Sequence, residues 1–158
     1  MTPIRFARIT VAIDGSPHSE EAFDAAIDVA KHYGGELTIL SVAPLVPVYM
    51  PSGNAYLAPP VAQTDTGPYR ALVEAAVKRA REAGAPSVTG ACPDGVVIDE
   101  ILAFLDAHPA DLVVVGSRGM SAAKRLLIGS ISSALVAHAP CPVLVVRGGA
   151  STKPTDER

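Results

Sequence analysis

The chain has 158 residues, which suits one domain with a sizeable hydrophobic core. Apolar residues make up 49% of the sequence and charged residues 18%, a balance that excludes an intrinsically disordered chain. The formal net charge of -3 disfavours a non-specific binder of nucleic acid or of an anionic membrane surface.

The sequence shows no clear targeting signal and no cysteine motif. No stretch reaches the ~18 uninterrupted apolar residues of a membrane-spanning helix, and no apolar signal-peptide segment precedes the first predicted strand. Cys92 and Cys141 match no metal-binding or redox spacing. We therefore expect a cytoplasmic protein with no membrane partner, whose thiols stay reduced.

The first part of the chain predicts a strand, a helix and a second strand. Residues 8–14 are β-branched and apolar up to their acidic end, which is typical of a core strand. Ser16 suits a helix N-cap and Pro17 the first helical position, and Gly34 ends the helical pattern. Residues 36–42 predict the second strand.

Residues 43–68 differ in kind from these elements. They contain six prolines together with Tyr49 and Tyr56, so they cannot form a regular helix or a central strand. A loop this long inside a domain is usually functional or mobile. We predict that it lies beside the ligand pocket and that its tyrosines cover the ligand.

The rest of the chain returns to alternating helices and strands. Residues 69–83 predict a helix, residues 87–92 a weak strand near a sheet edge, and residues 93–95 a turn. The remaining elements are a helix over 98–105, a strand over 112–116, a helix from Ser130 to about His138, a strand over 142–147 and a frayed polar tail over 148–158.

Strands that alternate with helices indicate βαβ units and therefore the α/β class. The expected fold is a single doubly wound domain over residues 1–147, with a five-stranded parallel sheet and helices on both faces. In such sheets ligands bind outside the carboxyl ends of the strands, where the strand order reverses.

The stretch that begins with the strand at 112–116 carries the strongest functional signal. Gly116 ends this strand, Gly119 follows in a loop, and Gly129 with Ser130 opens the next helix. Glycines let backbone N–H groups approach a phosphate closely, and a helix start adds unpaired donors and a positive dipole end. The stretch therefore predicts an anion site, although a glycine-rich turn without a ligand has the same residues.

Three cations lie in the same loop, namely Arg118, Lys124 and Arg125. Each either touches phosphate or is a solvated loop residue. The four histidines of the chain show neither metal-ligand nor base spacing.

The spacing of the glycines identifies a family. It is neither that of a P-loop nor that of a dinucleotide fold. The pattern Gly116-x2-Gly119-x9-Gly129-Ser130 resembles the nucleotide-binding motif of the universal stress proteins. The resemblance extends from Ile9 to about Arg147 and includes the strand ending Val-Ala-Ile-Asp-Gly-Ser and the closing Cys-Pro-Val-Leu-Val-Val.

This resemblance implies a strand order of 3-2-1-4-5, ATP as the ligand, and Mg²⁺ held mainly by the triphosphate. It also implies a homodimer through the last strand, where the exposed apolar edge Val143 to Val146 favours pairing with a second chain. The implied binding residues are Ala12, Ile13, Asp14, Val42, Val115, Gly116, Ser117, Arg118, Gly119, Gly129, Ser130, Ile131 and Ser132.

Alternatives remain open at this point. Asp14 either contacts the nucleotide or caps the first helix. Val42 either offers its backbone to the adenine edge or only packs in the core. The function implied is an ATP-binding regulatory or stress-response protein with at most slow hydrolysis. A dimeric scaffold without nucleotide and a true ATP-using enzyme are the alternatives, and no nucleophile-plus-base arrangement supports the enzyme.

Overall fold

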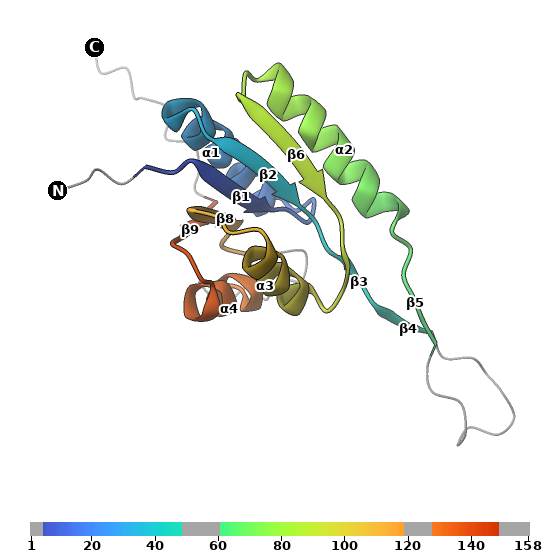
Figure 1. Cartoon of the computed structure of the whole chain (residues 1–158). Coiled ribbons are helices and arrows are strands. Elements are labelled where there is room, and N and C mark those ends of the chain that lie inside the picture. The colour runs from blue at the N-terminus through green and yellow to red at the C-terminus, as the bar shows by residue number, and fades with distance from the viewer. Residues whose placement is uncertain (1–4, 49–60, 119–127, 149–158) are drawn as a thin grey trace, which may run out of the picture.

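A five-stranded parallel sheet forms the centre of the molecule (Figure 1). The computed structural model describes residues 5–48, 61–118 and 128–148. The strand order is β6-β2-β1-β8-β9, and every neighbouring pair is parallel. The strands are β1 (Arg8–Ala12), β2 (Glu36–Leu40), β6 (Ser87–Ala91), β8 (Leu112–Gly116) and β9 (Val143–Val146).

The predicted α/β fold is confirmed. When only the strands of this sheet are counted along the chain, the order is 3-2-1-4-5. The strand labels run higher because four short strands lie outside the sheet. These are β3 (Ala43–Pro44), β4 (Val46–Val48), β5 (Val61–Gln63) and β7 (Asp94–Gly95).

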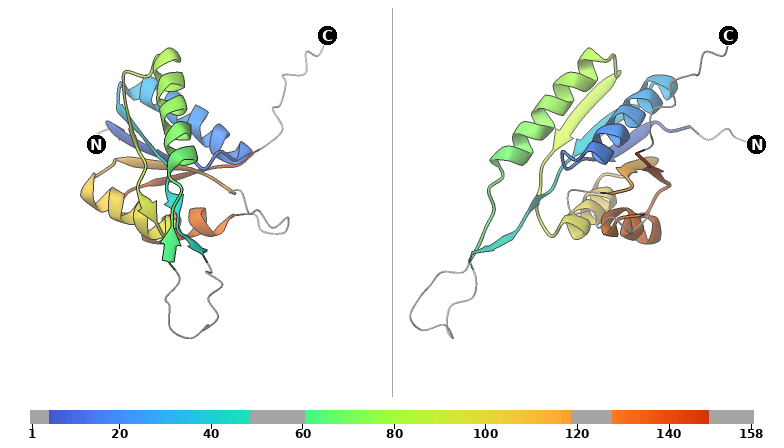
Figure 2. Two further views of the ribbon diagram at one scale, coloured as in Figure 1. Left: turned by 90° about the vertical axis from the view of Figure 1, so that its right-hand side faces the viewer. Right: turned by 180° about the vertical axis from the view of Figure 1, so that it is seen from behind.

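Helices cover both faces of the sheet, as Figures 1 and 2 show. α1 (Pro17–Tyr33) and α2 (Gly67–Glu82) pack on one face, where Phe23 is buried. α3 (Val97–Ala107) and α4 (Ser130–His138) pack on the other, where Leu135 is buried. Because side chains alternate along a strand, β8 contributes to both cores, with Val114 in the first and Val113 in the second.

Local signals set the bounds of α1 as predicted. The Ser16 hydroxyl accepts a hydrogen bond from the Ser19 amide at 3.3 Å, and Pro17 is the first helical residue. Such a cap contributes about 1 kcal/mol. At the other end Gly34 has φ of 64°, a left-handed conformation that favours glycine, and its amide donates to the Ala30 carbonyl.

Tertiary pairing changes two of the predicted boundaries. The predicted turn at residues 93–95 contains β7, which pairs in parallel with β3, so that Asp94 lies opposite Ala43. The second predicted strand ends at Leu40 because the chain leaves the sheet there and forms β3. Both changes depend on a partner about fifty residues away in the sequence, which no local pattern encodes.

The described part of the long segment at residues 43–68 contains short strands and no central strand, as predicted. β4 and β5 form an antiparallel ribbon that projects from the body of the molecule (Figure 2). α2 begins at Gly67, two residues before the predicted start. Tyr49 and Tyr56, to which a covering role was assigned, lie outside the described residues, as does the predicted tail after Gly148.

The predicted extent of the domain, residues 1–147, stays a prediction. No helix among the described residues combines the length and the hydropathy needed to cross a bilayer.

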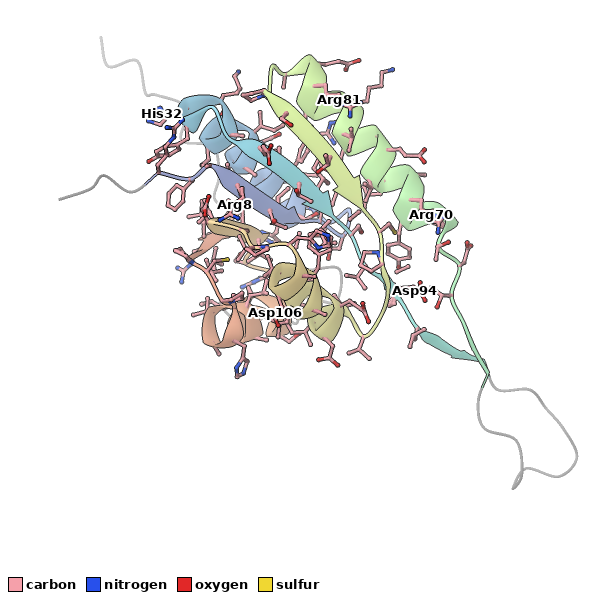
Figure 3. All side chains as sticks on the ribbon, in the orientation of Figure 1. Arg8, His32, Arg70, Arg81, Asp94 and Asp106 are labelled. Atoms are coloured by element: carbon pink, nitrogen blue, oxygen red, sulfur yellow. The ribbon has the colours of Figure 1, made fainter. Side chains whose placement is uncertain are left out.

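An ion pair joins the starts of the two central strands. One oxygen of the Asp111 carboxylate accepts from the Arg8 guanidinium at 2.8 Å, and the other accepts from the Ala7 and Arg8 amides at 3.1 and 2.9 Å. Figure 3 shows Arg8 at the start of β1. The hydrogen bond from the Arg8 side chain lowers the pKa of Asp111 below its ordinary value of 3.8, more than burial raises it. The charged carboxylate therefore stabilises the pairing of β1 with β8.

The first prediction concerns acid sensitivity. Because folding lowers the pKa of Asp111, its contribution to stability is present above pH 3.8 and is lost as the pH falls through the lower folded value. Asp111→Asn, which keeps the shape, should lower the thermal midpoint by a few degrees at pH 7. The gap between parent and variant should close towards pH 2. A gap that is constant with pH would show that the carboxylate charge contributes nothing.

Candidate functional site

The strand order reverses between β1 and β8, and the candidate site lies at their carboxyl ends. From β1 the chain enters α1 on one face of the sheet, whereas β8 leads towards α4 on the other face. The two connections therefore diverge to opposite faces of the sheet at these strand ends, which is where α/β proteins bind ligands.

The turn after β1 is held by a small hydrogen-bond network. The Asp14 carboxylate accepts from the Ser16 amide at 2.9 Å, and the Asp14 amide donates to the Ser19 hydroxyl at 3.3 Å. That hydroxyl in turn donates to the Ser16 carbonyl at 2.9 Å. The cap of α1 is thus Ser16, and Asp14 shapes the turn in front of it, half-buried at the edge of the site.

Four of the predicted contact residues have side chains that belong to the core. Ala12, Val42 and Val115 are buried beneath α3 and α4, and Ile13 is buried beneath α1 and α2. Their side chains are therefore committed to packing, and only backbone groups of these residues can face a ligand. Sequence reasoning left packing and ligand contact open for Val42, and the burial of its side chain is compatible with both.

Ser41 is a residue that the sequence analysis missed. It follows the last residue of β2, is 1% exposed, and its hydroxyl has no hydrogen-bond partner among the described residues. A buried hydroxyl without a partner is unfavourable by about 1–3 kcal/mol. The available signal was a serine between two apolar residues, Leu40 and Val42, at the end of a predicted strand, and such a pattern is too common to single out a site.

Gly116 brings the end of β8 against the first turn of α1. A Cβ atom at Gly116 would lie 2.6 Å from the His18 carbonyl oxygen and 3.0 Å from the Ser19 amide nitrogen. Only glycine allows this approach, because both neighbouring atoms belong to the backbone and cannot rotate away. Sequence reasoning assigned Gly116 to phosphate approach, and the structure adds a packing requirement.

Ser117 joins the end of β8 to the start of α4. Its carbonyl accepts from the Gly129 amide at 2.6 Å and from the Ser132 hydroxyl at 3.2 Å. Ser117 and Ser132 are both almost completely buried. The predicted ligand residues on either side of residues 119–127 are therefore brought together, with Gly119, Lys124 and Arg125 outside the described part.

The start of α4 presents backbone donors. The N-cap is Gly129, which has no side chain to bond the helix amides. By helical geometry the amides of Ser130, Ile131 and Ser132 have no carbonyl one turn earlier to bond. Ser130 is exposed and Ile131 half-buried, whereas the Ser132 hydroxyl donates to backbone carbonyls, including that of Gly129 at 3.1 Å. Arg118, half-buried after β8, is the one predicted loop cation within the described residues.

The described residues contain neither a metal-ligand cluster nor a cysteine with a lowered pKa. Across the described residues no group of three or more His, Cys, Asp or Glu side chains is placed to hold a metal ion. Burial raises the pKa of both Cys92 and Cys141 above the ordinary value of 9.0, so both thiols are protonated and weakly nucleophilic at pH 7.

A matched pair of glycine substitutions tests the packing role of Gly116. Gly116→Ala should destabilise the nucleotide-free protein by roughly 1–3 kcal/mol, because the new methyl group forces α1 away from β8. Gly129→Ala should cost less, because the nearest atom, the Ser117 carbonyl oxygen, would lie 3.3 Å away. Urea unfolding of both variants measures the difference, and equal losses would contradict the packing role.

Comparison with known proteins agrees with this geometry. The Universal stress protein family model matches residues 5–147. Universal stress protein YxiE of Bacillus subtilis is 34% identical over 148 residues, which are 90% of this chain and 99% of that protein. Among solved structures, universal stress protein UspA from Lactobacillus plantarum is 27% identical with a TM-score of 0.67, over 90% of this chain and 99% of that one.

A universal stress protein solved in complex with cAMP is 29% identical with a TM-score of 0.66. The match covers 90% of this chain and 98% of that one. With the family model spanning nearly the whole domain, the chain belongs to the universal stress protein family.

Proposed function

We propose that this chain binds ATP at the carboxyl ends of β1, β2 and β8 and uses it as a switch ligand in a cytoplasmic stress response, with at most slow hydrolysis. The observation that carries the proposal is the start of α4. Its N-cap is a glycine and its first amides lack helical partners, yet a short hydrogen bond fixes it against the end of β8.

The phosphates would bind at this helix start. The amides of Ser130 and Ile131 point out of the first turn, and the dipole of α4 adds positive potential there. Because Gly129 carries no side chain, a phosphate can approach these amides closely. Arg118 would contribute a cation to the phosphate end of the proposed site, and Gly119, which lies outside the described residues, is part of the proposed binding motif.

The base and ribose would bind towards β1 and β2. Asp14 lies half-buried at the edge of the site, where its carboxylate can accept from ribose hydroxyls or from the base. The backbone of Val42 offers hydrogen-bonding groups to the adenine edge, and the unpartnered hydroxyl of Ser41 lies next to it in sequence. A buried hydroxyl without a protein partner is a group that a polar ligand could satisfy.

The solved relative in complex with cAMP supports an adenine nucleotide as the ligand class. Mg²⁺ would be held mainly by the triphosphate and would neutralise phosphate charge, because the described residues offer no carboxylate cluster for it. A switch ligand is favoured over a substrate because the described site contains no nucleophile paired with a base.

Removal of one backbone donor tests the phosphate site. Ser130 is the first residue of α4, a position where proline is tolerated, and Gly129 before it is extended at φ -75° and ψ 169°, as proline requires. Ser130→Pro should therefore keep the helix and remove an amide donor. Calorimetry should show ATP binding in the micromolar range for the parent and roughly ten- to hundredfold weaker binding for the variant.

Ser130→Ala is the matched control, since it removes the hydroxyl and keeps the amide. It should bind ATP within a few-fold of the parent. If both variants bind ATP as the parent does and remain folded, the phosphates do not bind at α4. Titrations with AMP and cAMP in parallel show how much of the affinity the triphosphate provides.

A homodimer through β9 is the second part of the proposal. The Ser117 amide donates to the Val146 carbonyl, so alternation along the strand turns the backbone groups of Val143 and Val145 away from β8. Leu144 is 38% exposed. An apolar edge with outward donors and acceptors favours antiparallel pairing with a second copy about a two-fold axis.

Val145→Pro tests this interface with little effect on the sheet. The proline removes an N–H that faces outward, so the hydrogen bonds between β8 and β9 stay in place. Light scattering should give a dimer for the parent and a monomer for the variant, whereas Val145→Ala, which keeps the amide, should stay dimeric. A parent that is monomeric at tens of micromolar would refute the interface, and a dimer that survives the proline would place it elsewhere.

A further inference from the structure

The second edge of the sheet, β6, has backbone groups that face away from the molecule. The Ala91 carbonyl accepts from the Ser41 amide, so it faces inward towards the neighbouring chain segment. Alternation along the strand then turns the N–H and C=O groups of Val88 and Gly90 outward. In this respect β6 is the same kind of pairing surface as β9.

One of these outward groups is already occupied. The Arg81 guanidinium, at the end of α2, donates a hydrogen bond to the Val88 carbonyl at 3.0 Å. Figure 3 shows Arg81 on α2, the helix beside β6. An incoming strand needs this carbonyl as an acceptor, so it can pair with β6 only by displacing a charged side chain.

The surface next to this hydrogen bond is a groove of about 440 Å³ along the flank of α2. Its apolar part consists of Val73, Val77 and Gly90. Gly90 has to be glycine, because a Cβ atom there would lie 3.0 Å from the Val77 side chain and still closer to Val73. Position 90 of the strand therefore adds no side chain to the groove.

Arg81 also lines the groove, with Glu74, Lys78 and Glu82 as the other charged residues. Lys78 and Glu82 form an exposed ion pair with 3.9 Å between their charged atoms. Arg81 is the groove residue whose side chain bonds the strand backbone in the described structure. Within the described residues no comparable side-chain hydrogen bond reaches the outward groups of β9, whose own residues Val143 to Val146 are all apolar.

We infer that Arg81 closes the β6 edge and so confines self-association of this chain to other surfaces. Without the guanidinium, Val88 and Gly90 would offer outward donors and acceptors above an apolar groove. The occupant would be the β6 strand of a second copy, because two copies related by a two-fold axis pair antiparallel and each covers the groove of the other. This inference does not depend on nucleotide binding or on the β9 interface.

Two substitutions at Arg81 test the inference. Arg81→Ala removes the donor and the aliphatic stem, and Arg81→Met removes the donor and keeps most of the stem, which guards against loss of packing on α2. Lys78→Ala is the control, because it removes a charge from the same groove and no bond to the strand. Sedimentation velocity over a range of concentrations should show that both Arg81 variants form species of at least twice the mass of the parent species, whereas the control matches the parent. If the parent is a dimer through β9, each dimer carries two β6 edges, so the mass of the variant species should increase further with concentration.

Amide hydrogen exchange locates the new contact. The Gly90 amide should exchange quickly in the parent and at least tenfold more slowly in the associated Arg81 variants. Variants that remain folded and associate no more than the parent would overturn the inference. So would association that leaves the Gly90 amide unprotected, because the contact would then lie elsewhere.

Discussion

The packing of the end of β8 between two helices is the contact on which the site depends. Gly116 lies against the first turn of α1 on one face of the sheet, and the carbonyl of the next residue, Ser117, holds the start of α4 on the other. Two consecutive residues thus fix both helix starts relative to the strand ends. The contacts of Gly116 and Ser117 therefore set the positions of the α4 amides and of the turn after β1, because each helix continues with regular geometry from its first turn.

In this arrangement side chains and backbone have different roles at the strand ends. The side chains of Ala12, Val42 and Val115 fill the core, so only the backbone groups of these residues remain available to a ligand. The polar side chains nearby mostly hold the backbone in place: Ser132 bonds carbonyls, and Ser16 caps α1. The candidate site therefore offers a ligand mainly backbone amides and few polar side chains, of which Asp14 is one.

The two edges of the sheet differ in what faces the solvent. β9 presents an uninterrupted apolar strand, whereas a carbonyl of β6 is bonded by a charged side chain from the neighbouring helix. Each of these strands has only one neighbouring strand, so each has outward N–H and C=O groups without a partner in the sheet. The Arg81 side chain at the β6 edge is therefore sufficient to make the two edges differ in the backbone groups that they offer to a second strand.

The sequence alone determined most of the fold, because most helices and strands carry their own local signal, such as an apolar run or a capping residue. Apolar runs predicted four of the five strands clearly and β6 weakly, the serine and proline at 16 and 17 specified the start of α1, and the glycine spacing predicted a candidate site at the end of β8. What only the tertiary structure decided are contacts between segments far apart in the chain. The roles of Gly116 and Ser117, the pairing of β3 with β7 and the bond from Arg81 to Val88 depend on which backbone atoms become neighbours. Periodicity and capping act within a few residues, and no local pattern specifies a neighbour that the sheet brings in from elsewhere in the chain.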